Sequence, residues 1–184
     1  MIVDLQLNSM RLAGKKWGAE RSGDRTIAVL NPFTEEVLGT VPKITKQELI
    51  DYSNEVAHQT SAFFRPNFWV NTPDINPFHL QSGNPAMFAL RAVLASTLTP
   101  SWGMYAGFEL YEHRRFKEGG EEYLDSEKYE IKVRDWEGAA KKKLTLAPFI
   151  TLLNKIRREN VALQRLRNIH FHHCENDQII AFSK

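Results

Sequence analysis

The sequence predicts an α/β fold, and three patterns in it support that class. A strand near residues 64–71, a helix over 85–98 and a strand over 101–106 form a strand–helix–strand unit, which makes a parallel pair. Short strands and a capped helix precede this unit, and a helix followed by two strands comes after it. Such alternation is typical of helices packed on a sheet.

The first third of the chain predicts strands followed by one helix. Residues 11–17, 26–30 and 36–41 have strand character. Thr45 stands three residues before Glu48, which is the spacing of a capping box at the start of a helix. One face of this helix is weakly apolar and carries Leu49, Tyr52, Ser53 and Val56.

The strand near 64–71 runs into the turn Asn71-Thr72-Pro73-Asp74. Its apolar run predicts a strand buried on both faces. Residues just past the carboxyl ends of strands usually carry the chemistry in barrels and open sheets, which makes Asp74 a candidate reacting carboxylate. From position and residue type alone, the favoured alternative is an Asp that caps the next helix or closes an Asx turn.

The rest of the chain predicts two helices, a long loop and two strands. The helix over 85–98 has an apolar stripe of Met87, Leu90, Val93, Leu94 and Leu98. Residues 107–143 are charged and show no period, and the helix over 146–159 then places Phe149, Leu152, Leu153 and Ile156 on one face. Strands follow at 168–172 and 178–183, and the second ends at Lys184 without a turn, which predicts a truncated chain.

Composition indicates a soluble globular protein. Hydrophobic residues make up 42% of the 184, and 24 basic residues nearly cancel 22 acidic ones, so no nucleic-acid or membrane partner is expected. The lone Cys174 excludes an internal disulfide, and no signal peptide or membrane span is visible. The expected location is therefore cytoplasmic.

Three polar groups are weaker candidates for chemistry. Glu109 and Glu112 follow a strand and could form an acid/base pair, but ordinary loop residues are the better interpretation. His170 and His172 would share one face of a strand, with His173 opposite and Cys174 next, and surface histidines are favoured over a metal site. The run Lys141-Lys142-Lys143 is interpreted as a solvated surface.

The N-terminal segment resembles the extreme N-terminus of aldehyde dehydrogenases over residues 10–59. The residues that carry the resemblance are Leu12 to Trp17 and Val29 to Pro42. The resemblance implies a β-hairpin before the first helix of a cofactor domain. It includes neither the catalytic cysteine and glutamate of that family nor its segments for the nicotinamide cofactor.

A second resemblance covers residues 63–184. Its motifs are Phe64 to Ile75, Leu90 to Ala95, Pro100 to Gly103, Gly107 to Leu110, Glu121 to Glu130, Arg134 to Trp136, Leu146 to Pro148, Leu153 to Arg158, Ala162 to Gln164, and Asn176-Asp177 with Ile180 to Lys184. These motifs are similar to those of the maltosyltransferases of the α-amylase superfamily that extend α-1,4-glucans from α-maltose 1-phosphate.

This resemblance implies a (β/α)₈ barrel and a retaining double displacement, which needs a nucleophile, an acid/base and a stabilising carboxylate. Asp74 matches the transition-state stabiliser, and Lys128 and Tyr129 match the pair that contacts α-maltose 1-phosphate. No cofactor and no metal are implied. The expected fold is therefore an incomplete barrel fragment with its last two strands, preceded by a β-hairpin plus helix and followed by the first strands of a C-terminal β domain.

The whole chain is thus expected to be a chimera. The predicted parts are residues 1–59, dehydrogenase-like; 60–160, the end of a maltosyltransferase barrel; and 161–184, the start of a β domain. Without nucleophile and acid/base, a barrel fragment should be inactive alone and could self-associate through exposed surfaces. A dehydrogenase remnant and a non-catalytic carbohydrate-binding or interaction module remain as alternatives.

Overall fold

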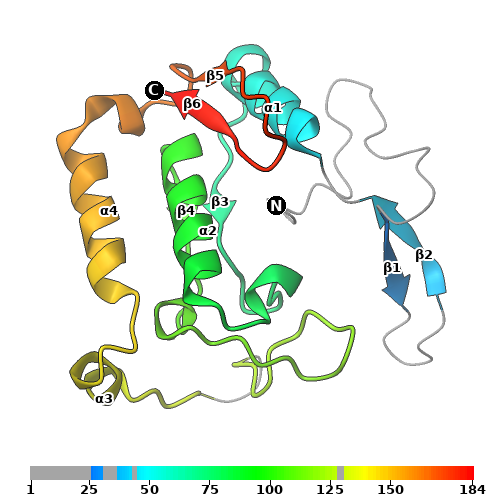
Figure 1. The fold of residues 1–184 in the computed structure, drawn as a ribbon, viewed down its shortest axis with the longest axis vertical. Coiled ribbons are helices and arrows are strands. Elements are labelled where there is room, and N and C mark those ends of the chain that lie inside the picture. The colour runs from blue at the N-terminus through cyan, green and yellow to red at the C-terminus, as the bar shows by residue number, and fades with distance from the viewer. Residues whose placement is uncertain (1–25, 31–36, 43–44, 128–130) are drawn as a thin grey trace.

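The computed structural model describes residues 26–30, 37–42, 45–127 and 131–184. A hairpin of β1 (Thr26–Leu30) and β2 (Val37–Pro42) stands beside a larger body in Figure 1. Its strands pair antiparallel, with a β-bulge between Val29 and Leu30. The two predicted strands here are confirmed, and the strand predicted at 11–17 lies outside the described residues.

Helix α1 (Lys46–Asn54) begins at the predicted capping box. The Thr45 hydroxyl accepts from the Glu48 backbone N–H at 3.2 Å, and the Thr45 N–H donates to Glu48 Oε2 at 2.8 Å. The last turn widens into the π-helical η1 (Glu55–Gln59). The predicted face of this helix is buried in full, at Leu49, Tyr52, Ser53 and Val56.

Strands β3 (Phe68–Trp69) and β4 (Trp102–Gly103) form the predicted parallel pair. The short 3₁₀ turn η2 (Phe78–Leu80) and helix α2 (Pro85–Leu98) connect them, and α2 has the predicted bounds. Phe68 is buried but Trp69 is 43% exposed, so the prediction of a strand buried on both faces is wrong. Successive side chains point to opposite faces of a strand, and helices of the described residues cover only one.

The open face brings the Trp69 ring close to Gly103. A Cβ atom added at Gly103 would lie 2.6 Å from the indole ring, so only glycine fits beneath it. On the covered face, α2 packs against both strands. Leu94 and Leu98 are buried as predicted, but Leu90 is 44% exposed. Phe88, outside the predicted stripe, is fully buried, and its ring packs against Phe108 and Tyr111 with centroids 4.9 and 5.4 Å apart.

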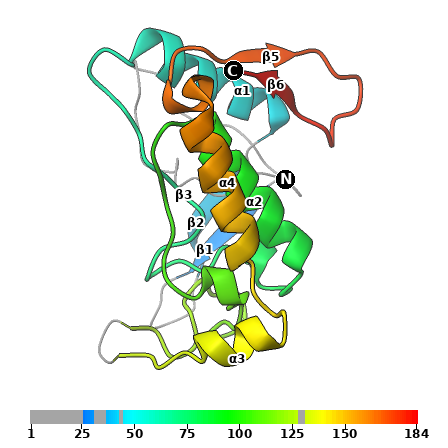
Figure 2. The same ribbon diagram turned by 90° about the vertical axis from the view of Figure 1, so that its left-hand side faces the viewer.

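That last helix is α4 (Ala147–Glu159), which lies beside α2 in Figures 1 and 2. Between β4 and α4 the chain forms the 3₁₀ turn η3 (Phe108–Leu110), a long loop and the short α3 (Trp136–Lys141). Leu153 of α4 is buried, but Leu152 and Ile156 are exposed, which corrects the predicted apolar face. The contact between α4 and α2 is too narrow to bury every residue of the predicted apolar face of α4.

The C-terminal segment returns to the top of the molecule in Figure 1. After η4 (Val161–Gln164), the two predicted strands are present over fewer residues, as β5 (His170–His172) and β6 (Ala181–Ser183). The structure shows that they pair antiparallel. They lie near α1, whose Lys46 ammonium donates to the Cys174 carbonyl at 2.9 Å.

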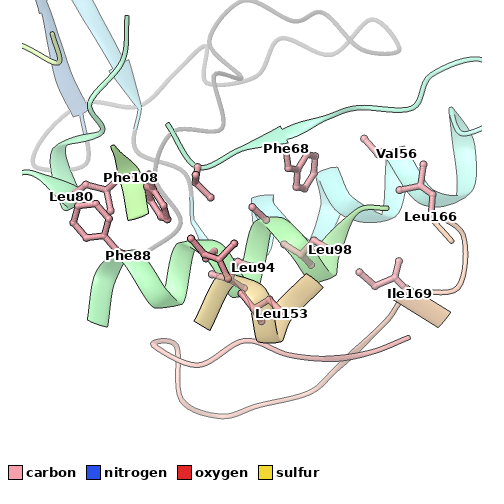
Figure 3. Close-up of a cluster of buried hydrophobic side chains, with 14 of the residues drawn as sticks. Val56, Phe68, Leu80, Phe88, Leu94, Leu98, Phe108, Leu153, Leu166 and Ile169 are labelled. Atoms are coloured by element: carbon pink, nitrogen blue, oxygen red, sulfur yellow. The ribbon is translucent and has the colours of Figure 1, made fainter. Parts of the chain in front are cut away.

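One core joins the elements from α1 onwards (Figure 3). Tyr52 of α1 stacks on Phe68 with ring centroids 6.5 Å apart, and Leu166 and Ile169 close the core from the C-terminal side. The core therefore draws on all three predicted segments, whose boundaries stay predictions. The described residues form three separate two-stranded sheets, and the barrel fragment also stays a prediction. None of their helices is long and apolar enough to cross a bilayer.

Candidate functional site

The candidate site lies at the carboxyl ends of β3 and β4. Because the two strands are parallel and in register, Phe68 with Trp102 and Trp69 with Gly103, their following loops leave the sheet at the same edge. The loop after β3 carries Asp74, and the loop after β4 leads through Tyr105 towards η3. The strand order thus brings these two loops together.

Asp74 is exposed on a braced loop. Thr72 and Ile75 exchange backbone hydrogen bonds at 3.2 Å, and the Thr72 hydroxyl also accepts from the Ile75 N–H at 3.0 Å. The next two helices are capped by Pro77 and Asn84, so Asp74 caps neither of them. The alternative of a helix-capping Asp is therefore excluded.

Asn76 anchors the far end of this loop. Its side chain is fully buried, its N–H donates to the Glu121 carbonyl at 2.5 Å, and its Nδ2 donates to the His113 carbonyl at 2.9 Å. Ser126 adds a contact from its hydroxyl to the Pro73 carbonyl at 3.4 Å. Residues 121–126, distant in sequence, therefore support the Asp74 loop.

Asn71 joins the two strand ends. Its Oδ1 accepts from the Tyr105 N–H at 2.9 Å, and its Nδ2 donates to the Tyr105 carbonyl at 3.4 Å and to the Tyr123 hydroxyl at 2.9 Å. Burial, the largest cause, raises the pKa of Tyr123 to about 12, so its hydroxyl stays neutral and available to accept this bond.

Arg134 is the centre of a charged cluster beside this edge. Its side chain is only 5% exposed, and it forms ion pairs with Glu112 at 2.8 Å and with Glu127 at 3.0 Å. Its guanidinium also lies over the Tyr105 ring, 5.6 Å from the centroid. Lys132 adds a second cation, with its ammonium 3.3 Å from Glu112 Oε2.

Hydrogen bonds keep Glu127 and Arg134 ionised. The Tyr105 hydroxyl donates to Glu127 Oε2 at 2.5 Å and the Lys132 N–H to Oε1 at 3.1 Å, and these bonds lower the pKa of Glu127 to about 2. Burial alone would lower the pKa of Arg134, but its hydrogen bonds to Glu112, Tyr105 and Glu127 outweigh that effect and raise it. Burial and the bond to Glu127 raise the pKa of the Tyr105 hydroxyl.

Behind the loop, Arg91 of α2 caps the end of β3. Its guanidinium donates to the Val70 carbonyl and, at 3.4 Å, to the Trp69 carbonyl. A third nitrogen lies 2.9 Å from His79 Nε2. Burial, with a smaller contribution from Arg91, lowers the pKa of His79 to about 3, so the imidazole is neutral and accepts from the guanidinium.

Lys128 and Tyr129, predicted to contact substrate, lie outside the described residues. Two described residues close to them in sequence, Glu127 and Lys132, belong to the charged cluster. The cluster was not anticipated from the sequence. Arg134 and Glu127 fall inside the densest family motifs, but their pairing with Glu112 depends on how the loop folds.

The weaker candidates take structural roles. Glu112 forms ion pairs with Lys132 and Arg134, and Glu109 Oε2 accepts from the Gly107 N–H at 3.0 Å. In these contacts each carboxylate has a structural partner, and the two do not pair with each other. Gly107 has a φ of +101°, and a Cβ there would overlap the Glu112 carboxylate. Glycine is therefore required at this approach.

The histidines of the C-terminal segment and the lysines of the 141–143 run are exposed. His170 and His172 share a face of β5, as alternation predicts, with ring centroids 4.9 Å apart. No group of three or more His, Cys, Asp or Glu residues suited to a metal occurs among the described residues. Lys141, Lys142 and Lys143 are exposed, in agreement with a solvated run.

A separate groove of about 830 Å³ lies between α1, α2 and the C-terminal hairpin. It is lined by both apolar and polar side chains, among them Thr45, Leu49, Leu90, Leu94, Ile179 and Phe182. None of the candidate residues at the β3–β4 edge lines it.

Comparison with known proteins identifies a set of bacterial relatives. The chain is 56% identical over 140 residues to alpha-1,4-glucan:maltose-1-phosphate maltosyltransferase 2 of Streptomyces coelicolor, a match that covers 76% of this chain and 21% of the relative. Identity with the maltosyltransferase of Corynebacterium glutamicum is 57% over 142 residues, or 77% of this chain and 21% of that protein. No family model matches the chain.

The extent of these matches is informative. The maltosyltransferase of Mycolicibacterium smegmatis is 52% identical over 152 residues, which is 83% of this chain and 22% of the relative. A contiguous match of that length in a chain of 184 residues has to include α1 and residues before Phe63. The chain thus spans about a fifth of the length of these curated relatives, and the similarity supports its interpretation as a maltosyltransferase fragment.

Proposed function

We propose that this chain supplies the stabilising carboxylate of a retaining maltosyl transfer from α-maltose 1-phosphate to an α-1,4-glucan. Asp74 carries this role, and Lys128 and Tyr129 contact the sugar phosphate. The observation that carries the proposal is the exposed Asp74 carboxylate on a braced loop at the carboxyl end of a parallel strand pair. The names of the relatives specify the two substrates.

A carboxylate suits this position because the transition state of glycosyl transfer resembles an oxocarbenium ion. Positive charge grows on the anomeric carbon and ring oxygen, and a fixed anion nearby lowers the barrier. A loop braced at Asn71 and Asn76 keeps the anion in place, so little reorganisation is needed during the reaction. Lys128 offers ammonium donors, and Tyr129 a hydroxyl and an apolar ring face.

The same chemistry predicts what the isolated chain does not do. A retaining mechanism needs a nucleophile and an acid/base besides the stabiliser. The candidates that could have served, Glu109 and Glu112, are committed to Gly107 and to the Arg134 cluster. We therefore expect binding of the donor without turnover.

In the test, the matched segment of the Streptomyces coelicolor relative is replaced by the corresponding residues of this chain, and the resulting exchanged enzyme is assayed. The exchanged enzyme should release phosphate from α-maltose 1-phosphate in the presence of glucan. Asp74→Asn should lower kcat at least about 100-fold with little change in KM, because a stabilising charge acts mainly in the transition state. Asp51→Asn on α1 is the matched control and should keep the activity of the exchanged enzyme.

Two results would contradict the proposal. Full activity of the exchanged enzyme with Asp74→Asn would exclude a catalytic role for Asp74. Phosphate release by the 184-residue chain alone would contradict its expected inactivity. Lys128→Ala and Tyr129→Phe in the exchanged enzyme should instead raise KM, since they are proposed to bind the donor in its ground state.

A non-catalytic carbohydrate-binding module is the second candidate, and the exposed Trp69 favours it. An indole on an open sheet face is a stacking platform for a sugar ring. Saturable binding of maltose that is weakened by Trp69→Ala but not by Asp74→Asn would favour this alternative. No binding of maltose at millimolar concentration would remove it.

The proposal extends to fold and setting. A parallel β3–β4 pair joined by α2, with one open face, is consistent with the end of a barrel, and Tyr52 of α1 stacks on Phe68 of this pair. The dehydrogenase resemblance would gain support from binding of a nicotinamide cofactor by the chain. We also propose a cytoplasmic location. We further propose self-association through the open face of the β3–β4 pair, which light scattering of the purified chain tests.

A further inference from the structure

The described contacts link the buried Arg134 to the loop of Asp74 through residues 121–127. Arg134 donates from Nε to Glu112 and from one terminal nitrogen to Glu127. The planar guanidinium thereby fixes the distance between the segment after η3 and the end of the 121–127 segment. Glu127 is held from a second side by the Tyr105 hydroxyl at 2.5 Å.

The 121–127 segment in turn contacts the Asp74 loop at three points on either side of Asp74. Tyr123 accepts from Asn71, the Glu121 carbonyl accepts from the Asn76 N–H, and Ser126 donates to the Pro73 carbonyl. Tyr123 and Asn76 are both buried, so these contacts compete little with water. Displacement of this segment would release the loop.

Removal of the guanidinium would produce such a displacement. Glu112 and Glu127 are each about a fifth exposed, at 19% and 23%, and both accept from the same guanidinium. Without it, Lys132 is the one cation that the described contacts still place on the two carboxylates, and their repulsion separates the segments. Tyr105 alone cannot supply the missing charge.

We propose that Arg134 is a positioning residue that holds the 121–127 segment against the Asp74 loop and thereby sets the place of the stabilising carboxylate. This inference rests on the proposed function for its consequence in sugar binding, but its structural part stands independently of it. Arg134 itself need not contact substrate.

The test uses the full chain and amide hydrogen exchange followed by NMR or mass spectrometry. Arg134→Met should speed exchange at the Asn76 and Ile75 amides about tenfold, while amides of α2 such as Ala92 exchange as before. Arg134→Lys, which keeps the charge but loses the fork, should restore part of the protection. Arg158→Met removes the same charge and shape from an exposed position of α4 and should leave all these amides unchanged.

The second readout is titration of each variant with α-maltose 1-phosphate. If the wild-type chain binds it, Arg134→Met should weaken binding about tenfold and Arg158→Met should not. If the wild-type chain does not bind, the donor-binding part of the proposed function fails, whereas the exchange data still decide the role of Arg134.

Two outcomes would overturn the inference. Unchanged exchange at Asn76 in Arg134→Met would show that the loop does not depend on Arg134. Equal acceleration in the loop and in α2 would show a general loss of stability instead of positioning. Should Arg134→Met not fold, Glu127→Gln keeps the size of the side chain, removes one ion pair and is judged by the same two outcomes.

Discussion

Asn71 and Tyr105 pair side chain to backbone across the ends of the two parallel strands, in both directions. Asn71 Oδ1 accepts the Tyr105 N–H at 2.9 Å and Nδ2 donates to the Tyr105 carbonyl at 3.4 Å. The carboxamide thus imitates a peptide group and extends the ladder beyond Trp69 and Gly103. This rung holds the Asp74 loop and the Tyr105 loop at one edge.

Asn71→Ala should therefore destabilise the chain. The half-buried backbone of Tyr105 and the buried Tyr123 hydroxyl would lose their hydrogen bonds, at a cost of about 2–3 kcal/mol in the free energy of unfolding. Urea denaturation followed by tryptophan fluorescence measures it. Asn67→Ala is the control. It removes an exposed amide directly before β3, and we expect the free energy of unfolding to change by less than about 0.5 kcal/mol. Equal effects of the two substitutions would contradict the role of the rung.

Glu127 should contribute to stability in a defined pH window. Its pKa falls from an ordinary 4.5 to about 2, first through the Tyr105 hydroxyl and then through the Lys132 N–H. The unfolded chain binds more protons between these values, so the stabilisation is present above pH 4.5 and is lost as the pH falls towards 2. Unfolding free energies should decline less steeply over this range in Glu127→Gln. Glu118→Gln, with its side chain 94% exposed, should keep the wild-type slope.

His79 should add a second pH dependence at higher pH. Burial and Arg91 lower its pKa from an ordinary 6.5 to about 3, so the unfolded chain again binds more protons between the two values. Stability from this group is complete above pH 6.5 and decreases as the pH falls. The His79 imidazole signals in NMR spectra should stay those of the neutral ring at pH 5. A protonated His79 in the folded chain at that pH would disprove the buried arrangement.

Helix α1 should fold with the rest of the chain. Tyr52 stacks on Phe68, and Val56 is 1% exposed in the same core. A chain of residues 45–184 should therefore melt at a clearly higher temperature than one of residues 61–184, which exposes Phe68. Circular dichroism melts of the two chains give the comparison. Equal melting temperatures would instead support a boundary near Gln59–Ser61.

Local patterns predicted the longer helices and the described strands, but not the short α3 inside the predicted loop. The capping box at Thr45, the bounds of α2 and the parallel pair around it follow from side-chain spacing and connection length, which are properties of neighbouring residues. Burial was predicted less well. Leu90 and Leu152 belong to apolar stripes but are exposed, because exposure depends on which faces other elements cover.

The sequence by itself determined the order of the elements and placed Asp74 after the end of a strand, since periodicity, caps and turns act between near neighbours. Only the tertiary structure decided what supports that carboxylate. Arg134, Glu112 and Glu127 meet because a long loop without regular period folds back on the strand ends, and such contacts depend on packing between distant segments. The physical reason is that pairing of these half-buried charges requires a specific three-dimensional arrangement that no local spacing encodes.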